Sequence, residues 1–202
     1  MAPLTEKRFL EITKNHKLTI VREDGLYRHL RVGIPGQEME SWNIHTWPGY
    51  LAMVGDMGDW VFSRLDDMLC FFRSDPGTLQ TNPGYWAEKL QAQEREGWSQ
   101  FSIEEFHERV KEWAIEACDV ESFGDIPEDR RDDLESLLDA GDEYEAVAEQ
   151  RRFQSDWLDL TDFWDGRHPC QRVRDHYLFA CYAITWTVRL YDEQRPTEAE
   201  AS

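Results

Sequence analysis

The sequence predicts an α+β fold: an N-terminal antiparallel β-meander of four to five strands, packed with helices and followed by an acidic helical lobe. Three observations lead to this prediction. Short segments of alternating apolar residues, separated by turn dipeptides, fill residues 17–63. Apolar residues recur at the helical period after residue 102. Acidic side chains concentrate in residues 101–165, which hold 22 acidic and 6 basic residues.

The N-terminal region is expected to begin with a short helix whose N-cap is Thr5. The strands are expected at residues 17–22, 26–32, 41–46, 50–54 and 60–63. Asp-Gly and Pro-Gly dipeptides between them supply turns that antiparallel neighbours need. In the second strand, alternation places Arg28 and Leu30 on one face of the sheet and Tyr27 and His29 on the other.

The rest of the chain is expected to be mainly helical, at residues 65–73, from 83, at 102–117, 127–138, 142–153 and 173–191. Ser102 and Glu105 form a capping-box pattern, in which each side chain accepts a hydrogen bond from the other residue's backbone amide. The last of these helices is apolar on nearly all sides, which predicts a buried central helix. We expect a single domain over residues 1–202, with a sheet region at 1–100 and a helical region at 101–202.

The formal net charge of −19 excludes several classes of partner. A surface this acidic repels phosphates, so no direct binding to nucleic acid or to an anionic membrane is expected. No apolar run is long enough to span a bilayer, and the first residues do not resemble a signal peptide. The four cysteines form no CxxC pair, which indicates a reduced, cytoplasmic setting.

Three segments carry a resemblance to known sequences. They read TWPGYLAMVGDMGDWVFSRLDDMLCFFR at residues 46–73, NPGYW at 82–86 and HYLFACYAITWTVRLYD at 176–192. Together they resemble a family of uncharacterised proteins common in temperate phages and prophages. The resemblance covers most of the chain and weakens across the acidic middle. It implies an accessory protein of the bacterial host cytoplasm, of the kind that inhibits or modulates a host system, and it supplies no catalytic residues.

Four glutamates at four-residue spacing are the strongest candidates for a binding surface: Glu104, Glu108, Glu112 and Glu116. Like charges at this spacing destabilise a helix by about 0.2–0.5 kcal/mol per pair. One interpretation is a phosphate-mimicking surface that binds a host protein with a basic site, such as a defence or nucleic-acid-handling protein. A DNA strand carries a charge about every 3.4 Å, so several helices would have to converge to mimic it. The other interpretation is a solvated face that keeps the protein soluble.

Further contact candidates follow along the acidic region. They are Asp129, Asp132, Asp133, Trp157 and Trp164. Large aromatic rings surrounded by acids are typical of binding hot spots, but tryptophans at this spacing are equally typical of a helical core. Both interpretations stay open at the level of the sequence.

An enzyme or nucleotide-binding protein is the alternative. His29, His45 and Arg64 fall on or next to predicted strands and could border one sheet face, where histidines could serve in acid–base chemistry. Asp56 and Asp59 lie on a glycine-rich turn and could act as a paired acid and base. The competing interpretation is that these are ordinary residues of a wet sheet face and a tight turn.

No metal or cofactor is expected. His168, Cys170, His176 and Cys181 are zinc-ligand types, but their spacing matches no usual closed zinc pattern. Glycine-rich phosphate loops and nucleophile elbows are absent from the sequence. Binding to a protein partner is therefore favoured over catalysis.

Overall fold

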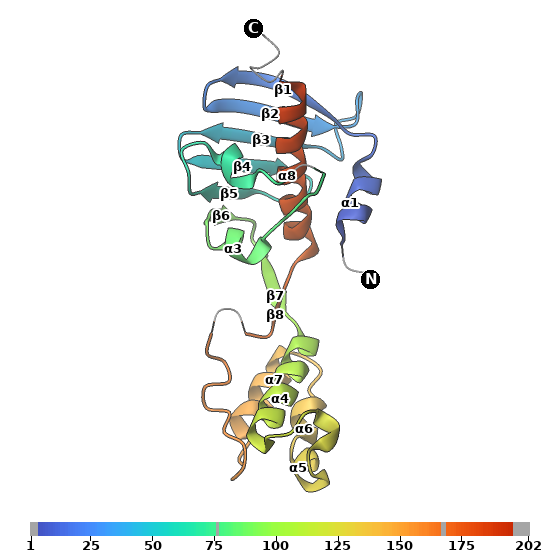
Figure 1. Ribbon diagram of the computed structural model, residues 1–202, viewed down its shortest axis with the longest axis vertical. Coiled ribbons are helices and arrows are strands. Elements are labelled where there is room, and N and C mark those ends of the chain that lie inside the picture. Colours follow the sequence, from blue (N-terminus) through green and yellow to red (C-terminus); the bar gives the residue numbers. More distant parts are fainter. Residues whose placement is uncertain (1–3, 76, 167–168, 196–202) are drawn as a thin grey trace. The chain divides into compact units, whose positions relative to one another are not determined.

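The computed structural model describes residues 4–75, 77–166 and 169–195. The chain forms two compact units (Figure 1). Unit 1 comprises Met1–Trp98 and Val173–Ser202, and unit 2 comprises Ser99–Arg172. Unit 2 is therefore an insertion in the sequence of unit 1. Every helix within the described ranges is too short or too polar to traverse a lipid bilayer.

Unit 1 is built on a six-stranded antiparallel sheet, and it confirms the predicted α+β class. The strands are β1 (Lys17–Asp24), β2 (Tyr27–Gly33), β3 (Trp42–Trp47), β4 (Tyr50–Gly55), β5 (Trp60–Ser63) and β6 (Leu90–Gln93). Their order in the sheet is the same as their order in the chain, as in a meander. The first five lie within one or two residues of the predicted strands, because alternation and turn residues are local signals.

The number of strands differs from the four to five that the sequence predicts. β6 has the sequence LQAQ, which is short and has no β-branched or aromatic residues. It becomes a strand because it pairs with β5, where Trp60 lies opposite Gln93 and Phe62 lies opposite Leu90. β6 is therefore extended because it pairs with β5, which is distant from it in the sequence.

The two faces of the sheet differ in burial. Leu30 and Ile44 are fully buried on the inner face, while Tyr27 and His29 lie on the outer face as predicted. Arg28 shares the buried inner face, also as predicted. The core of unit 1 fills the space between this inner face and the helices.

Four helices complete unit 1: α1 (Glu6–Thr13), α2 (Met68–Phe72), α3 (Pro83–Ala87) and α8 (Asp175–Gln194). Thr5 caps α1 as predicted, because its side chain accepts a hydrogen bond from the Arg8 amide. α8 crosses one face of the sheet (Figure 1), and the Trp42 indole donates to the Thr187 hydroxyl at 2.9 Å. The sequence predicts a buried central helix here, and α8 confirms it. However, it packs with the sheet rather than with the helices of residues 101–165, because its apolar surface matches the inner face of the sheet.

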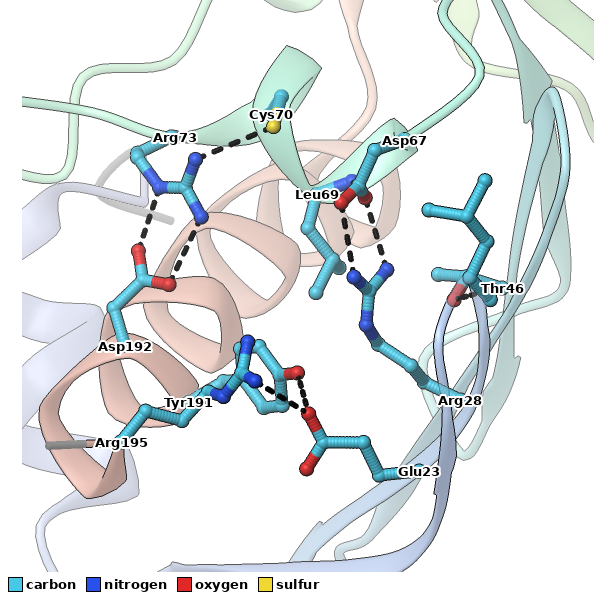
Figure 2. A network of polar contacts seen from close by, with 11 residues as sticks. Glu23, Arg28, Thr46, Asp67, Leu69, Cys70, Arg73, Tyr191, Asp192 and Arg195 are labelled. Carbon is cyan, nitrogen blue, oxygen red and sulfur yellow. Dashed lines mark hydrogen bonds and ion pairs between the residues drawn. The ribbon is translucent and has the colours of Figure 1, made fainter. Parts of the chain in front are cut away.

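A buried ion pair joins β2 to the start of α2 (Figure 2). The Arg28 guanidinium donates two hydrogen bonds of 2.9 Å to the two carboxylate oxygens of Asp67. Asp67 also caps α2, since it accepts a hydrogen bond from the Leu69 amide at 3.0 Å. One carboxylate therefore neutralises a buried cation and satisfies a helix terminus.

The end of α8 is held by two further groups of contacts (Figure 2). Arg73 forms a two-pronged ion pair with Asp192, at 2.6 and 2.9 Å, on the surface. The Tyr191 hydroxyl donates to Glu23, which also pairs with Arg195 at 3.3 Å. These contacts connect α8 to α2 and to the edge strand β1.

Unit 2 contains a short β7 (Ser99–Phe101), which pairs with β8 (Gln171–Val173), and a group of helices. The helices are α4 (Ile103–Cys118), the 3₁₀ helix η1 (Phe123–Asp125), α5 (Glu128–Asp133), α6 (Glu135–Leu138) and α7 (Glu143–Arg152). They enclose a second hydrophobic core that shares no residue with the first. Phe106 and Phe163 are fully buried within it.

Two local predictions for unit 2 need correction. Residues 127–138 form two short helices rather than one, with the buried Leu134 at the junction. The capping box is half formed: the Glu105 amide donates to the Ser102 hydroxyl, but the Ser102 amide donates to the Cys170 carbonyl at 2.8 Å. Ser102 follows β7 and Cys170 precedes β8, so the hydrogen bond between them continues the pairing of these two strands. The Ser102 amide is therefore not available to the Glu105 side chain.

Candidate functional site

The four glutamates on α4 share an exposed face of unit 2. We call Glu104, Glu108, Glu112 and Glu116 the glutamate row; all four are exposed, whereas Phe106, Val110 and Ala114 on the other side of the helix are buried. Residues four apart lie about 6 Å apart along a helix axis and about 40° apart around it, so the carboxylates form a stripe that winds slowly around α4. The structure thus brings the four residues together as their spacing predicts.

The aspartates of α5 lie near the C-terminal end of α4. Asp129, Asp132 and Asp133 are all exposed. Arg130, on the same helix, donates a hydrogen bond to the Cys118 sulfur at 3.3 Å, and Cys118 is the last residue of α4. This contact brings a second acidic helix to the end of the glutamate row.

Two arginines of unit 2, Arg109 and Arg130, donate to groups other than carboxylates. Arg109 donates to the carbonyl oxygens of Phe163 and Asp165, at 2.9 and 3.2 Å. Arg130 binds a sulfur atom and lies over an indole ring. Within the described part of unit 2, the ion pairs are Lys111–Glu108 and Arg152–Glu149, both at 2.7 Å. Three members of the glutamate row therefore have no cation within ion-pair distance among the described residues.

The two candidate tryptophans have different surroundings. Trp164 stacks on Phe106 in the core of unit 2, and its indole N–H donates to Gln150 at 2.9 Å. Trp157 is half-buried at the acidic surface, where its indole N–H donates to Asp133 at 2.9 Å and Arg130 covers its ring. Both rings pack against the core of unit 2, and Trp157 in addition reaches the acidic surface through its bond to Asp133.

The structure brings together two of the five candidates for acid–base chemistry. His29 and His45 lie opposite each other on β2 and β3, and their rings stack with centroids 4.2 Å apart. The His29 Nε2 donates to the Asn43 side-chain oxygen at 2.9 Å. Burial, and secondly the charge of His29, lower the pKa of His45.

The other three candidates lie toward the ends of the sheet. Asp56 follows the end of β4, four residues beyond Ala52, which is opposite His45. At the rise of a strand this places it about 13 Å from the histidine pair. Asp59 is in the same turn, whereas Arg64 follows the far end of β5. Since Asp56 and Arg64 lie at opposite ends of the β4–β5 hairpin, the five residues do not form one cluster.

The lowered pKa of His45 predicts a measurable pH dependence. An unfolded histidine titrates near pH 6.5, so below about this pH the unfolded chain binds a proton more readily than the native state does. Stability is therefore lost on acidification. We expect the free energy of unfolding of His45→Gln to fall less than that of the wild type between pH 7 and pH 5, as measured by urea denaturation. Parallel pH curves for the two proteins would contradict the expectation.

A pocket of about 350 Å³ lies in unit 1, at the end of the sheet where β3 begins. Its lining is mostly apolar and includes Leu4 before α1, Ile12 on α1, Trp42 on β3, Met57 after β4 and Phe179 on α8. Concave, mostly apolar cavities of this size are where small-molecule ligands usually bind. This pocket was not predicted from the sequence.

The rim of the pocket contains a residue in a strained conformation. Glu40 has φ of 56°, in the left-handed region that non-glycine residues seldom adopt. Its carbonyl accepts a hydrogen bond from His16 Nε2 at 2.7 Å, and its amide donates to the Asp56 carboxylate at 2.5 Å. Such strain costs on the order of 1–3 kcal/mol and persists only where neighbouring groups enforce it. His16 and Asp56, which both line the pocket, enforce it here.

One nitrogen of His16 lacks a partner. His16 stacks on Trp42 and is buried, and its Nδ1 has no hydrogen-bond partner among the described residues. Because Nε2 donates its proton to the Glu40 carbonyl, Nδ1 of the neutral ring is an acceptor. Leaving a buried polar group unpaired costs about 1–3 kcal/mol. His16, which lines the pocket, thus carries one buried ring nitrogen without a partner.

Comparison of the chain with protein-family models, curated proteins and solved structures gave no match. In the part of the chain that the structure describes, no three His, Cys, Asp or Glu side chains are placed to hold a metal ion. Of the zinc-ligand types, Cys170 is in unit 2 and His176 and Cys181 are on α8 of unit 1, while His168 lies outside the described residues. The glutamate row and the pocket are thus the two surfaces with the most distinctive chemistry.

Proposed function

We propose that this chain is a phage-encoded interaction protein of the bacterial cytoplasm, and that unit 2 is an acidic lobe that binds a basic host protein. The observation that supports this proposal is the shortage of ion pairs along the glutamate row. Arg109 and Arg130 donate to carbonyl oxygens and a sulfur atom, and among the described residues Glu108 is the one member of the row with an ion-pair partner. Uncompensated charge of one sign attracts a partner of the opposite sign and steers its approach.

The arrangement of the acids favours a partner that normally binds phosphates. The glutamate row alone has a spacing of about 6 Å, which is wider than that of DNA phosphates. α5 adds Asp129, Asp132 and Asp133 beside the end of α4, so more than one helix supplies carboxylates. A basic groove of a nucleic-acid-handling or defence protein is the complementary surface. The resemblance to phage and prophage proteins is the reason to place that partner in the host.

The alternative function, an enzyme or nucleotide-binding protein on the sheet face, has weaker support. Acid–base catalysis needs its groups within hydrogen-bond reach of one substrate. His29 and His45 are in contact, but Asp56, Asp59 and Arg64 lie toward the two ends of the sheet. We therefore favour binding over catalysis.

Neutralising the glutamate row tests the proposal. The variant E104Q/E108Q/E112Q/E116Q is expected to remain folded with an equal or higher melting temperature, because it removes like-charge pairs worth about 0.2–0.5 kcal/mol each. Its affinity for the host partner is expected to fall at least about tenfold. The wild type is first used to capture the partner from host lysate. The captured protein is then titrated with the wild type and with the variant, at low and at high salt.

A matched control changes the same number of charges in unit 1. Glu11, Glu38, Asp59 and Asp66 are exposed there, and E11Q/E38Q/D59N/D66N alters the net charge by the same amount. This control should bind the partner as the wild type does. Equal loss of binding in both variants, or binding that does not weaken with salt, would contradict a surface formed by the glutamate row.

A further inference from the structure

The pocket of unit 1 is independent of the proposed partner surface, since all its lining residues belong to unit 1. We propose that it binds a small aromatic amine. The ring of the ligand packs among Trp42, Met57 and Phe179, and its ammonium group lies at the rim near Glu40 and Asp56. Size, charge and hydrogen-bonding capacity each support this assignment.

The interior of the pocket suits a flat ring of one or two cycles. A volume of about 350 Å³ is at the lower end of ligand pockets, so the occupant is a small molecule rather than a peptide. Trp42 and Phe179 meet edge to face with ring centroids 5.9 Å apart, which provides an aromatic wall. Aromatic rings prefer such walls, and the indole face attracts cations as well.

The charges around the pocket favour a cation over an anion. Three carboxylates line it, from Glu40, Asp56 and Asp175, against one guanidinium, from Arg8. Asp175 is in the first turn of α8, where its negative charge offsets the positive end of the helix dipole. An anionic ligand would approach an excess of negative charge, whereas an ammonium group would be attracted to it.

The hydrogen-bonding groups favour a donor on the ligand. The carboxylates of Glu40 and Asp56, which line the pocket, are acceptors. His16 and Asp56 also fix both backbone groups of Glu40, so the rim is held in place before a ligand arrives. A preformed rim lowers the ordering cost of binding.

The test compares three probes that share one ring: tryptamine, indole and indole-3-propionate. Calorimetric titration of the full chain at pH 7 is expected to show tryptamine binding tightest, indole weaker and indole-3-propionate weakest, with a gap of at least about tenfold between the amine and the acid. Resonances of residues lining the pocket should shift in amide NMR spectra. Absence of tryptamine binding at millimolar concentration, or tighter binding of the acid, would overturn the proposal.

Two variants test whether tryptamine binds in this pocket, and two control variants change charge elsewhere on the protein. Ile12→Arg places a cation at a rim position that is 51% exposed, so the fold should tolerate it, and tryptamine affinity should fall at least about tenfold. Asp56→Asn keeps an oxygen for the Glu40 amide and removes the charge, which should also weaken binding. Val54→Arg, at a 44% exposed position on β4, and the glutamate-row variant should bind tryptamine as the wild type does. Unchanged affinity in Ile12→Arg would overturn the assignment, whatever the fate of the partner surface in unit 2.

Discussion

Replacing Asp67 with alanine is expected to lower the free energy of unfolding by about 3–5 kcal/mol. The Arg28 side chain is only 8% exposed, and Asp67 is the carboxylate that pairs with it through two hydrogen bonds. Without Asp67, a buried guanidinium loses its counterion, and α2 loses the side chain that caps it. Urea denaturation at pH 7 measures the loss.

The Arg73–Asp192 pair provides a control of similar geometry and different burial. Both pairs have two hydrogen bonds, but the Arg73 and Asp192 side chains are 46% and 37% exposed. Asp192→Ala should therefore cost less than about 1 kcal/mol. Similar costs for the two variants would show that burial of Arg28 does not set the penalty.

The Arg28–Asp67 pair also predicts how the difference in stability between the wild type and Asp67→Ala depends on pH. Burial alone would raise the pKa of Asp67, but the hydrogen bonds and charge of Arg28 hold that pKa below its ordinary value. A carboxyl with a lowered native pKa stabilises the fold above the unfolded pKa of about 3.9, and this contribution is lost as the pH falls through the native value. The gap between wild type and Asp67→Ala should stay constant from pH 7 to about 5 and narrow below about pH 4.

Replacing Phe106 with alanine is expected to destabilise unit 2 strongly while the stability of unit 1 stays unchanged. Phe106 is fully buried and contacts Phe163 and Trp164. Removing a buried phenylalanine costs about 3–5 kcal/mol, which is a large share of the roughly 4–11 kcal/mol that a unit of this size has in total. Because the two cores share no residue, the loss should not spread to unit 1.

Hydrogen exchange followed by mass spectrometry separates the two units. Peptides from α4 to α7 should exchange faster in Phe106→Ala than in the wild type, while peptides from the sheet and α8 keep their protection. Tyr144→Ala is the control within unit 2, since this side chain is 83% exposed and its removal should change stability by less than about 0.5 kcal/mol. Simultaneous loss of protection in the sheet would contradict separate cores.

The elements that the sequence predicts well are those that local signals define. The first five strands follow from alternation and turns, and the exposure of the glutamate row follows from the helical period. The buried Arg28 was assigned to the correct face by alternation alone. A buried arginine needs a counterion, but the sequence did not identify it, because Asp67 lies 39 residues away.

The features that the sequence did not predict are formed by distant segments. β6 becomes a strand only through its pairing with β5, and β7 through its pairing with β8. The pocket combines residues from α1, from the turn after β4 and from α8, so no contiguous motif marks it. The one local hint was His16 close to the apolar face of α1, just before the first strand.

The two chain positions that flank unit 2 are themselves hydrogen-bonded to each other. The Arg174 amide donates to the Trp98 carbonyl at 2.9 Å, so the sheet unit closes on itself at the base of the insertion. A short turn could join these positions without disturbing the strands. The chain therefore leaves and re-enters the sheet unit at neighbouring positions, and the sheet unit has a complete hydrophobic core of its own.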